Sequence, residues 1–153
     1  MTRCLIGFYS SAEDELPGFN SLLHLMCDGQ PSAIFKMTKS ILERGFKLRG
    51  NRPDQISAWL LYSLIAESVK NSVARRLKLP DSPLSPPDGI DFTGYGIVNT
   101  INDDAEYLYR INCDKQNILV YHCDSRSENG WSHKYTFSSI ADIEKLFDSS
   151  GLQ

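Results

Sequence analysis

The fold of this chain is decided around Pro80–Gly89, whose sequence is PDSPLSPPDG. Four prolines in ten residues break any regular helix or paired strand, because proline lacks a backbone N–H and fixes φ. Apolar residues recur at helical spacing before this stretch and at a period of two after it. The charge changes as well: residues 1–79 carry 11 Lys and Arg against 7 Asp and Glu, whereas residues 81–153 carry 5 against 12. The stretch therefore separates two halves of different structure and opposite charge.

The first half is expected to form one strand followed by helices. Alternating apolar side chains predict a strand over residues 3–9. Apolar spacing of three and four, with proline or glycine at the boundaries, predicts three helices, at Leu16–Cys27, Ser32–Arg44 and Pro53–Lys78. In the third helix Trp59, Tyr62 and Ala66 lie on one expected face. The apolar band is widened by Leu60, Leu61, Leu64 and Ile65, so the helix is apolar around much of its girth, which predicts a central core helix.

The second half is expected to form an antiparallel sheet. Its short segments are rich in β-branched and aromatic residues, and turn-forming residues separate them. Ser139, with Asp142 three residues on, resembles a capping box and predicts a closing helix. The separators have the length of hairpin loops, which favours a meander of four strands, at Tyr95–Ile101, Glu106–Ile111, Asn117–Cys123 and Ser132–Phe137.

These elements predict an α+β fold in a single domain spanning residues 1–153. The N-terminal strand and mainly helical half (1–79) would pack on a C-terminal four-stranded antiparallel meander with a closing helix (90–148). The segment 80–89 would connect them. Neither half is expected to fold alone, because the sheet has an apolar face that the third helix is suited to cover.

The composition is that of a soluble globular protein, with 41% hydrophobic and 23% charged residues. The N-terminal apolar run is too short for a signal peptide, and the longest apolar stretch is too short to span a bilayer. We therefore expect a cytoplasmic protein that does not bind membranes. Four cysteines without paired spacing are expected to be reduced, small hydrophobic residues rather than disulfides.

The usual sequence signatures of catalysis are missing, including phosphate-binding glycine loops and nucleophile elbows. Zinc-type ligands occur only as the scattered set Cys113, His122, Cys123 and His133. Adjacent strand residues point to opposite faces, so His122 and Cys123 are not expected to share one ion; His122 is expected on the solvated face and Cys123 in the core. Nothing in the spacing pairs one histidine with one acid. We predict no enzyme activity, no cofactor and no metal.

Basic residues of the helical half offer an alternative function. Phosphates of a nucleic acid are contacted by clusters of this kind, here Lys36, Lys39, Lys47, Arg49 and Arg52. The sequence pI of about 5.6 disfavours a dedicated nucleic-acid binder. A small nucleic-acid-associated factor or an enzyme using this half therefore stays the second hypothesis.

The acidic half carries the preferred candidate site. Its carboxylates fall at turns and outward strand positions, and aromatic residues are interleaved with them. Aromatic anchors rimmed by charge are typical of protein interfaces. Asp103, Asp104 and the loop 124–128 are the expected neighbours. The predicted partner-binding residues are Asp103, Asp104, Glu106, Tyr107, Asp124, Glu128 and Trp131.

The segment Tyr135–Phe147, YTFSSIADIEKLF, predicts a final strand leading into a helix. With the acidic, aromatic meander before it, the chain resembles bacterial immunity proteins of contact-dependent inhibition and related polymorphic toxin systems. The resemblance implies a non-enzymatic inhibitor that occludes the active site of a cognate, basic toxin such as a nuclease. A flat acidic surface would favour this function, whereas a polar cleft near His122 or His133 would favour the second hypothesis.

Overall fold

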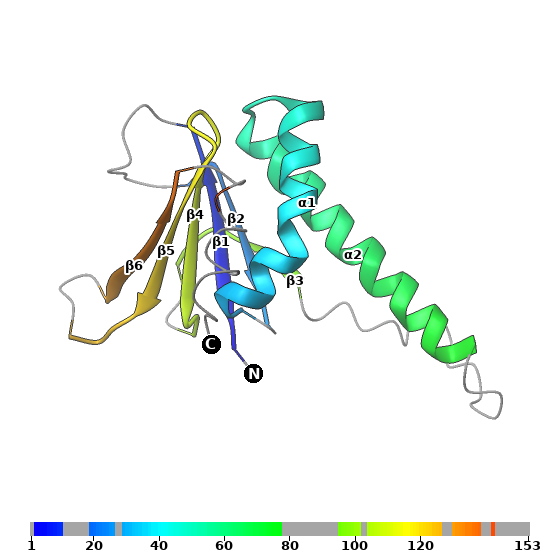
Figure 1. Ribbon diagram of the computed structural model, residues 1–153. Helices are drawn as coiled ribbons and strands as arrows, with labels where there is room; N and C mark the ends of the chain where they lie inside the picture. Colours follow the sequence, from blue (N-terminus) through cyan, green and yellow to red (C-terminus); the bar gives the residue numbers. More distant parts are fainter. Residues whose placement is uncertain are drawn as a thin grey trace.

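The computed structural model describes residues 2–10, 19–26, 29–77, 95–101, 104–126, 130–138 and 142, and within 67–77 the backbone alone. These residues form an α+β structure in which two helices cover one face of a six-stranded mixed sheet (Figure 1). The α+β class expected from the sequence is confirmed. The elements are β1 (Cys4–Tyr9), β2 (Ser21–Leu25), α1 (Pro31–Arg49), α2 (Pro53–Leu77), β3 (Tyr95–Val98), β4 (Tyr107–Asn112), β5 (Asn117–Cys123) and β6 (Trp131–Phe137).

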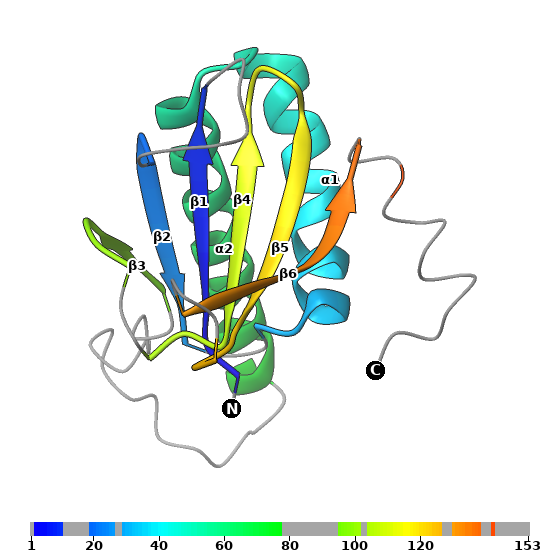
Figure 2. The same ribbon diagram turned by 90° about the vertical axis from the view of Figure 1, so that its left-hand side faces the viewer.

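The sheet runs in the order β3-β2-β1-β4-β5-β6, which Figure 2 shows from the side opposite the helices. Strand β1 lies near its centre, antiparallel to β2 and parallel to β4. All six residues of β1 are buried, because helices cover one face and apolar side chains gather on the other. A strand buried on both faces reads as the continuous apolar run CLIGFY.

The predicted four-stranded meander is partly correct. Strands β4, β5 and β6 do form successive antiparallel pairs. Strand β3, however, pairs with β2 and not with β4, so β2 and β1 intervene between β3 and the rest of the expected meander. The predicted closing helix lies outside the described residues, apart from Asp142.

The helix predicted over Leu16–Cys27 is wrong where the structure describes it, because Ser21–Leu25 is strand β2. Its leucines serve both faces of the sheet. Leu23 and Leu25 enter the core under the helices, whereas Leu22 joins Leu5 on the opposite face. A short run that is apolar on both faces has no period of two, so helix and strand look alike in the sequence.

One core lies between the sheet and the helices, and residues from both halves of the chain contribute to it. Phe35 of α1 packs edge-on against Tyr109 of β4 and Phe137 of β6, with ring centroids 5.7 and 4.7 Å apart. Aromatic rings that pack edge to face stabilise the fold by more than the apolar area that they bury. Helix α1 therefore covers the strands of the C-terminal half.

Helix α2 buries only part of the apolar band expected for it. Ile56, Leu60 and Leu64 are its core residues, whereas Tyr62 is 68% exposed. Trp59 is half-buried against α1, where it donates a hydrogen bond from Nε1 to the carbonyl of Ile41 at 3.2 Å. Figure 1 shows that the backbone of α2 continues beyond the sheet. No helix in the described part of the chain is long and apolar enough to cross a membrane.

Candidate functional site

The predicted partner-binding residues gather at one end of the sheet, where β1 and β4 begin and β5 ends. Tyr107 opens β4, Asp124 follows β5 and Trp131 opens β6, so the two antiparallel connections bring them together. The backbone N–H of Cys123 donates to the carbonyl of Glu106 at 2.8 Å. We call this group the sheet-end surface; its described residues are Asp104, Glu106, Tyr107, Asp124 and Trp131. Asp103 and Glu128 lie outside the described residues.

Arg3, the residue before strand β1, adds to the sheet-end surface a cation that the sequence analysis did not assign. Arg3 forms an ion pair with Asp104 at 3.4 Å, with exposed side-chain fractions of 41% and 72%. Its carbonyl also accepts hydrogen bonds from the backbone N–H groups of Glu106 and Tyr107, at 3.0 and 3.4 Å. The parallel pairing of β1 with β4 therefore sets a cation beside the predicted acids. Within the described residues Glu106 is exposed and forms no ion pair.

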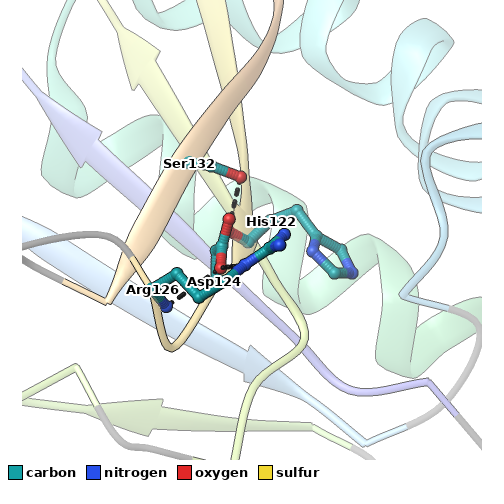
Figure 3. Close-up of polar contacts among 4 residues, drawn as sticks. All are labelled: His122, Asp124, Arg126 and Ser132. Atoms are coloured by element: carbon teal, nitrogen blue, oxygen red, sulfur yellow. Dashed lines mark hydrogen bonds and ion pairs between the residues drawn. The ribbon is translucent and has the colours of Figure 1, made fainter.

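Asp124 has a structural task in the turn after β5. Its Oδ1 accepts hydrogen bonds from the backbone N–H of Arg126 at 3.0 Å and from its Nε at 3.3 Å (Figure 3). The backbone hydrogen bond, followed by the guanidinium contact, lowers the pKa of the Asp124 carboxyl below its ordinary value. Aspartate commonly organises turns in this way. The negative charge of Asp124 is thus partly committed to the turn and to Arg126.

The two aromatic residues of the sheet-end surface lie on opposite faces of the sheet. Trp131 packs on the face away from the helices, against a cluster that includes Leu5 and Leu108. Tyr107 lies on the helix side, where its ring stacks 6.3 Å from that of Tyr109. Both rings are half-buried. The sequence thus predicts the shared end of the sheet correctly but does not separate its two faces.

A pocket of about 320 Å³ opens on the helix side of this end. It lies between the start of α1 and three strands, which places residues from both halves of the chain around one space. Its volume is at the lower end of the range for small-molecule sites. The lining residues are Gln30, Pro31 and Ser32 before and within α1, Tyr107 of β4, His122 of β5, and Lys134 and Tyr135 of β6.

A β-bulge explains how Lys134 reaches this pocket. Val120 pairs with Tyr135, but the next residue, Tyr121, pairs with His133, so Lys134 is the additional residue on β6. Strict alternation would place Lys134 and Tyr135 on opposite faces; the bulge lets both line the pocket. Sequence analysis missed Lys134 because a register shift leaves no clear signature, although three polar residues in succession in SHKY interrupt the alternation of β6.

The positions expected for His122 and Cys123 are reversed in the structure. His122 lies on the helix side, half-buried in the pocket, with its ring edge-on to Tyr107 at 5.0 Å. Cys123 is exposed. The pocket lies at the end of the sheet, beyond the packed core, so a polar ring fits there. The backbone carbonyl of His122 accepts a hydrogen bond from Ser132 Oγ at 3.5 Å, and its imidazole makes none of the contacts drawn in Figure 3.

The scattered zinc-type ligands stay apart in the structure. Cys113 follows β4 at the far end of the sheet from Cys123, and burial raises the pKa of its thiol to about 12. His133 lies on the opposite face from His122, stacked edge-on to Tyr121 and 2.9 Å from the hydroxyl of Thr136. Among the residues that the structure describes, no three His, Cys, Asp or Glu side chains gather as a metal site.

Several basic residues of the helical half have partners. The guanidinium groups of Arg44 and Arg49 lie 5.8 and 6.0 Å from the ring centroid of Trp59. Lys39 and Arg52 form ion pairs with Glu43 and Asp54, respectively, each in the same local segment. Lys36 and Lys47 are exposed on α1.

Comparison of the chain with protein-family models, curated proteins and solved structures found no match.

Proposed function

We propose that this chain is a non-enzymatic binding protein that docks a basic protein partner on the sheet-end surface. The observation that carries the proposal is that the start of β4, the turn after β5 and the start of β6 bring carboxylates and half-buried aromatic rings to one end of the sheet. Tyr107 and Trp131 have the character of interface anchors, because a large ring buries much area while losing little conformational freedom.

The particular partner that we propose is a toxin whose active site the chain occludes. This step rests on the resemblance of the C-terminal segment to immunity proteins of polymorphic toxin systems. A toxin that cleaves nucleic acid presents cations to bind phosphates. Carboxylates on the inhibitor accelerate the encounter and block that cleft without any chemistry of their own.

The electrostatic part of this mechanism depends on Asp104 and Glu106. Within the described residues Glu106 is exposed and unpaired, and the one ion pair of Asp104 is with the partly exposed Arg3. Exposed ion pairs contribute about 0–1 kcal/mol, so cations of a partner can replace Arg3 at small cost. Asp124 is expected to contribute less, because its carboxylate holds the turn at Arg126.

The second hypothesis, a nucleic-acid factor or enzyme using the basic helices, has weaker support. Arg44, Arg49 and Arg52 are engaged with Trp59 or Asp54, which leaves fewer free cations on this side. The polar pocket beside His122 is the feature that the sequence analysis expected to favour this second hypothesis, and it supports a ligand site there. Within the described residues, however, no carboxylate contacts the imidazole, so the pocket supports binding rather than acid–base catalysis.

The test is co-expression with the protein encoded beside this chain's gene. That protein alone should arrest bacterial growth, and this chain should restore it. The purified pair should form a complex whose association rate falls as salt rises, because exposed charges are screened over about 10 Å at 0.1 M.

Matched charge reversals identify the working surface. Asp104→Lys with Glu106→Lys should slow association about tenfold or more and leave the melting temperature nearly unchanged, because both side chains are exposed. Lys36→Glu with Lys47→Glu should have little effect. The proposal would be rejected if the variant with Asp104→Lys and Glu106→Lys still restored growth and the variant with Lys36→Glu and Lys47→Glu did not. That result would support the basic helices as the binding surface.

A further inference from the structure

The pocket between α1 and the sheet is independent of the acidic interface in its chemistry. Only Tyr107 belongs to both the pocket and the sheet-end surface. The other polar side chains of the pocket are an amide, a hydroxyl, an imidazole, an ammonium and a second phenol. Among the described residues this set is rich in hydrogen-bond donors and contains no carboxylate. An anion therefore matches the lining better than a cation or an apolar group.

The start of α1 adds backbone donors to this set. Gln30 occupies the N-cap position, yet its side chain forms no capping hydrogen bond, and the first turn holds no acidic residue. Pro31, the first residue of α1, has no N–H, so the backbone donors here are the N–H groups of Ser32 and Ala33, which have no acceptor within the helix. The dipole of α1 places partial positive charge at the same end. Proteins usually satisfy this end with a side-chain oxygen or an acid. Here the pocket lies at that end.

The start of α1 is also held rigidly before any ligand binds. The buried hydroxyl of Tyr109 donates to the carbonyl of Gly29 at 2.7 Å, and the N–H of Gly29 donates to the carbonyl of Thr2 at 2.9 Å. A Cβ at position 29 would lie 2.8 Å from the carbonyl carbon of Arg3 and 2.9 Å from Cβ of Cys4. The helix start is thus fixed closely against β1, which lowers the ordering cost of binding.

Lys134 is the additional residue at the bulge of β6, and it lines the pocket. It forms no ion pair within the described residues. Its charge helps to lower the pKa of Asp124, but Arg126 holds that carboxylate. A bulge that turns a cation toward a pocket is the kind of irregularity found next to binding sites.

Tyr107 remains a hydrogen-bond donor at physiological pH. Burial raises the pKa of Tyr107, and the neighbouring Tyr135 and Glu106 raise it further, so the phenol stays protonated. The carboxylate of Glu106 is close enough to affect the pKa of Tyr107, but Glu106 is not among the residues that line the pocket. The phenol of Tyr107, the hydroxyl of Ser32 and the ammonium of Lys134 together offer several donors to one multiply charged group.

We propose that this pocket binds the phosphate group of a small phosphate monoester, with the phosphate at the N-terminus of α1 beside Lys134 and the organic part against the rings of Tyr107, His122 and Tyr135. A phosphate presents several acceptor oxygens, which suits this number of donors better than a carboxylate does. The volume of about 320 Å³ fits a molecule of about mononucleotide size or smaller. This site goes beyond the proposed protein-docking function and does not depend on it.

The test is a titration of the full chain with phenyl phosphate, followed by two-dimensional NMR of backbone amides. Saturable shifts should concentrate at Gln30–Ala33, His122 and Lys134–Tyr135. Inorganic phosphate should compete with phenyl phosphate, whereas benzoate at the same concentration should not. Equal competition by benzoate would overturn the assignment to phosphate, and the absence of saturable shifts would overturn the site.

Two variants and a matched control complete the test. Lys134→Ala should weaken phenyl phosphate binding about tenfold or more, whereas Lys47→Ala, at the other end of α1, should leave it unchanged. Gln30→Asp should abolish binding while raising the melting temperature, because an N-cap carboxylate satisfies the helix start itself. Wild-type affinity in either pocket variant would reject the proposal. The pair Asp104→Lys and Glu106→Lys should still bind phenyl phosphate, which separates this site from toxin docking.

Discussion

The two ends of the sheet differ in what their polar side chains do. Where β1 and β4 end, these side chains form hydrogen bonds with one another; where the two strands begin, polar side chains line a pocket. At the first end Asp114 accepts hydrogen bonds from Ser10 Oγ at 2.5 Å and from Asn51 Nδ2 at 2.6 Å. Asn112 Oδ1 accepts the backbone N–H groups of Asp114 and Lys115. At the other end the side chains of Gln30, His122 and Lys134 face open space.

The difference teaches which polar residues hold the fold and which are available to a ligand. Groups that satisfy each other are structural, and removing one leaves its partners without hydrogen bonds. Groups that line a pocket without protein partners cost little to remove, because water already replaces the ligand there. Stability measurements should therefore separate the two ends.

The largest effect is expected for Asn112→Ala at the hydrogen-bonded end. Asn112 is fully buried, and its loss would leave two backbone N–H groups of the β4–β5 turn without their acceptor. We expect a loss of about 2–3 kcal/mol in the free energy of unfolding. The matched control is Asn117→Ala, because Asn117 pairs with Asn112 across the hairpin but its Oδ1 has no partner. Urea denaturation that ranks Asn117→Ala as the costlier change would break the comparison.

A smaller loss is expected for Gly29→Ala at the pocket end. The new methyl group would meet the backbone of Arg3, so α1 must move away from β1. We expect about 1–2 kcal/mol of destabilisation, the usual cost of overpacking, together with loss of phenyl phosphate binding. Gly96→Ala is the control, because nothing lies within 4 Å of its Cβ position. Thermal unfolding and the NMR titration check both parts; unchanged binding would show that the helix start is not fixed as described.

Asp124 is expected to make the stability of the fold depend on pH in the acid range. Its pKa is lowered in the folded chain, chiefly by the backbone hydrogen bond from Arg126, relative to the ordinary value of 3.8. Its contribution to stability is therefore full well above pH 3.8 and is lost as the pH falls through the lower folded pKa. The melting temperature of the wild type should approach that of Asp124→Asn as the pH falls from 6 to about 2. A constant difference between the two proteins would contradict the assignment of this carboxylate to the turn.

The smallest effect on stability is expected for Lys134→Ala. Its side chain is exposed and forms no ion pair within the described residues, so the free energy of unfolding should change by less than about 0.5 kcal/mol. The same substitution should weaken phosphate monoester binding strongly. Circular dichroism melting beside the NMR titration measures both; a large stability loss would mean that Lys134 belongs to the fold.

Local patterns in the sequence predicted much of this fold. The period of two and the short turns gave β4, β5 and β6 and their antiparallel order, and the apolar helical spacing gave α1 and α2. Pairings between distant segments were not predictable in this way. Nothing local in CLIGFY indicates that β1 lies parallel to β4, and this pairing is what turns a four-stranded meander into a six-stranded sheet.

The candidate site was predictable to the same extent. Hairpin geometry placed Asp104 and Asp124 at a common end of the sheet, as expected. The pocket was not foreseen, because its walls come from both halves of the chain and its cation depends on the bulge at Lys134. A register shift changes the direction of a side chain while leaving composition and propensity unchanged.

The parallel pairing of β1 with β4 also governs how the chain is made. In the register Cys4 pairs with Tyr107, so during synthesis one edge of β1 waits for a partner that is translated about a hundred residues later. An unpaired apolar edge is a hazard for aggregation while the nascent chain is on the ribosome. Folding is therefore expected to be completed only after β4 emerges, and a chain cut at the proline-rich segment should yield an insoluble N-terminal half. When the two fragments are mixed, the amount of soluble, folded protein should depend on how much of β4 pairs with the unpaired edge of β1.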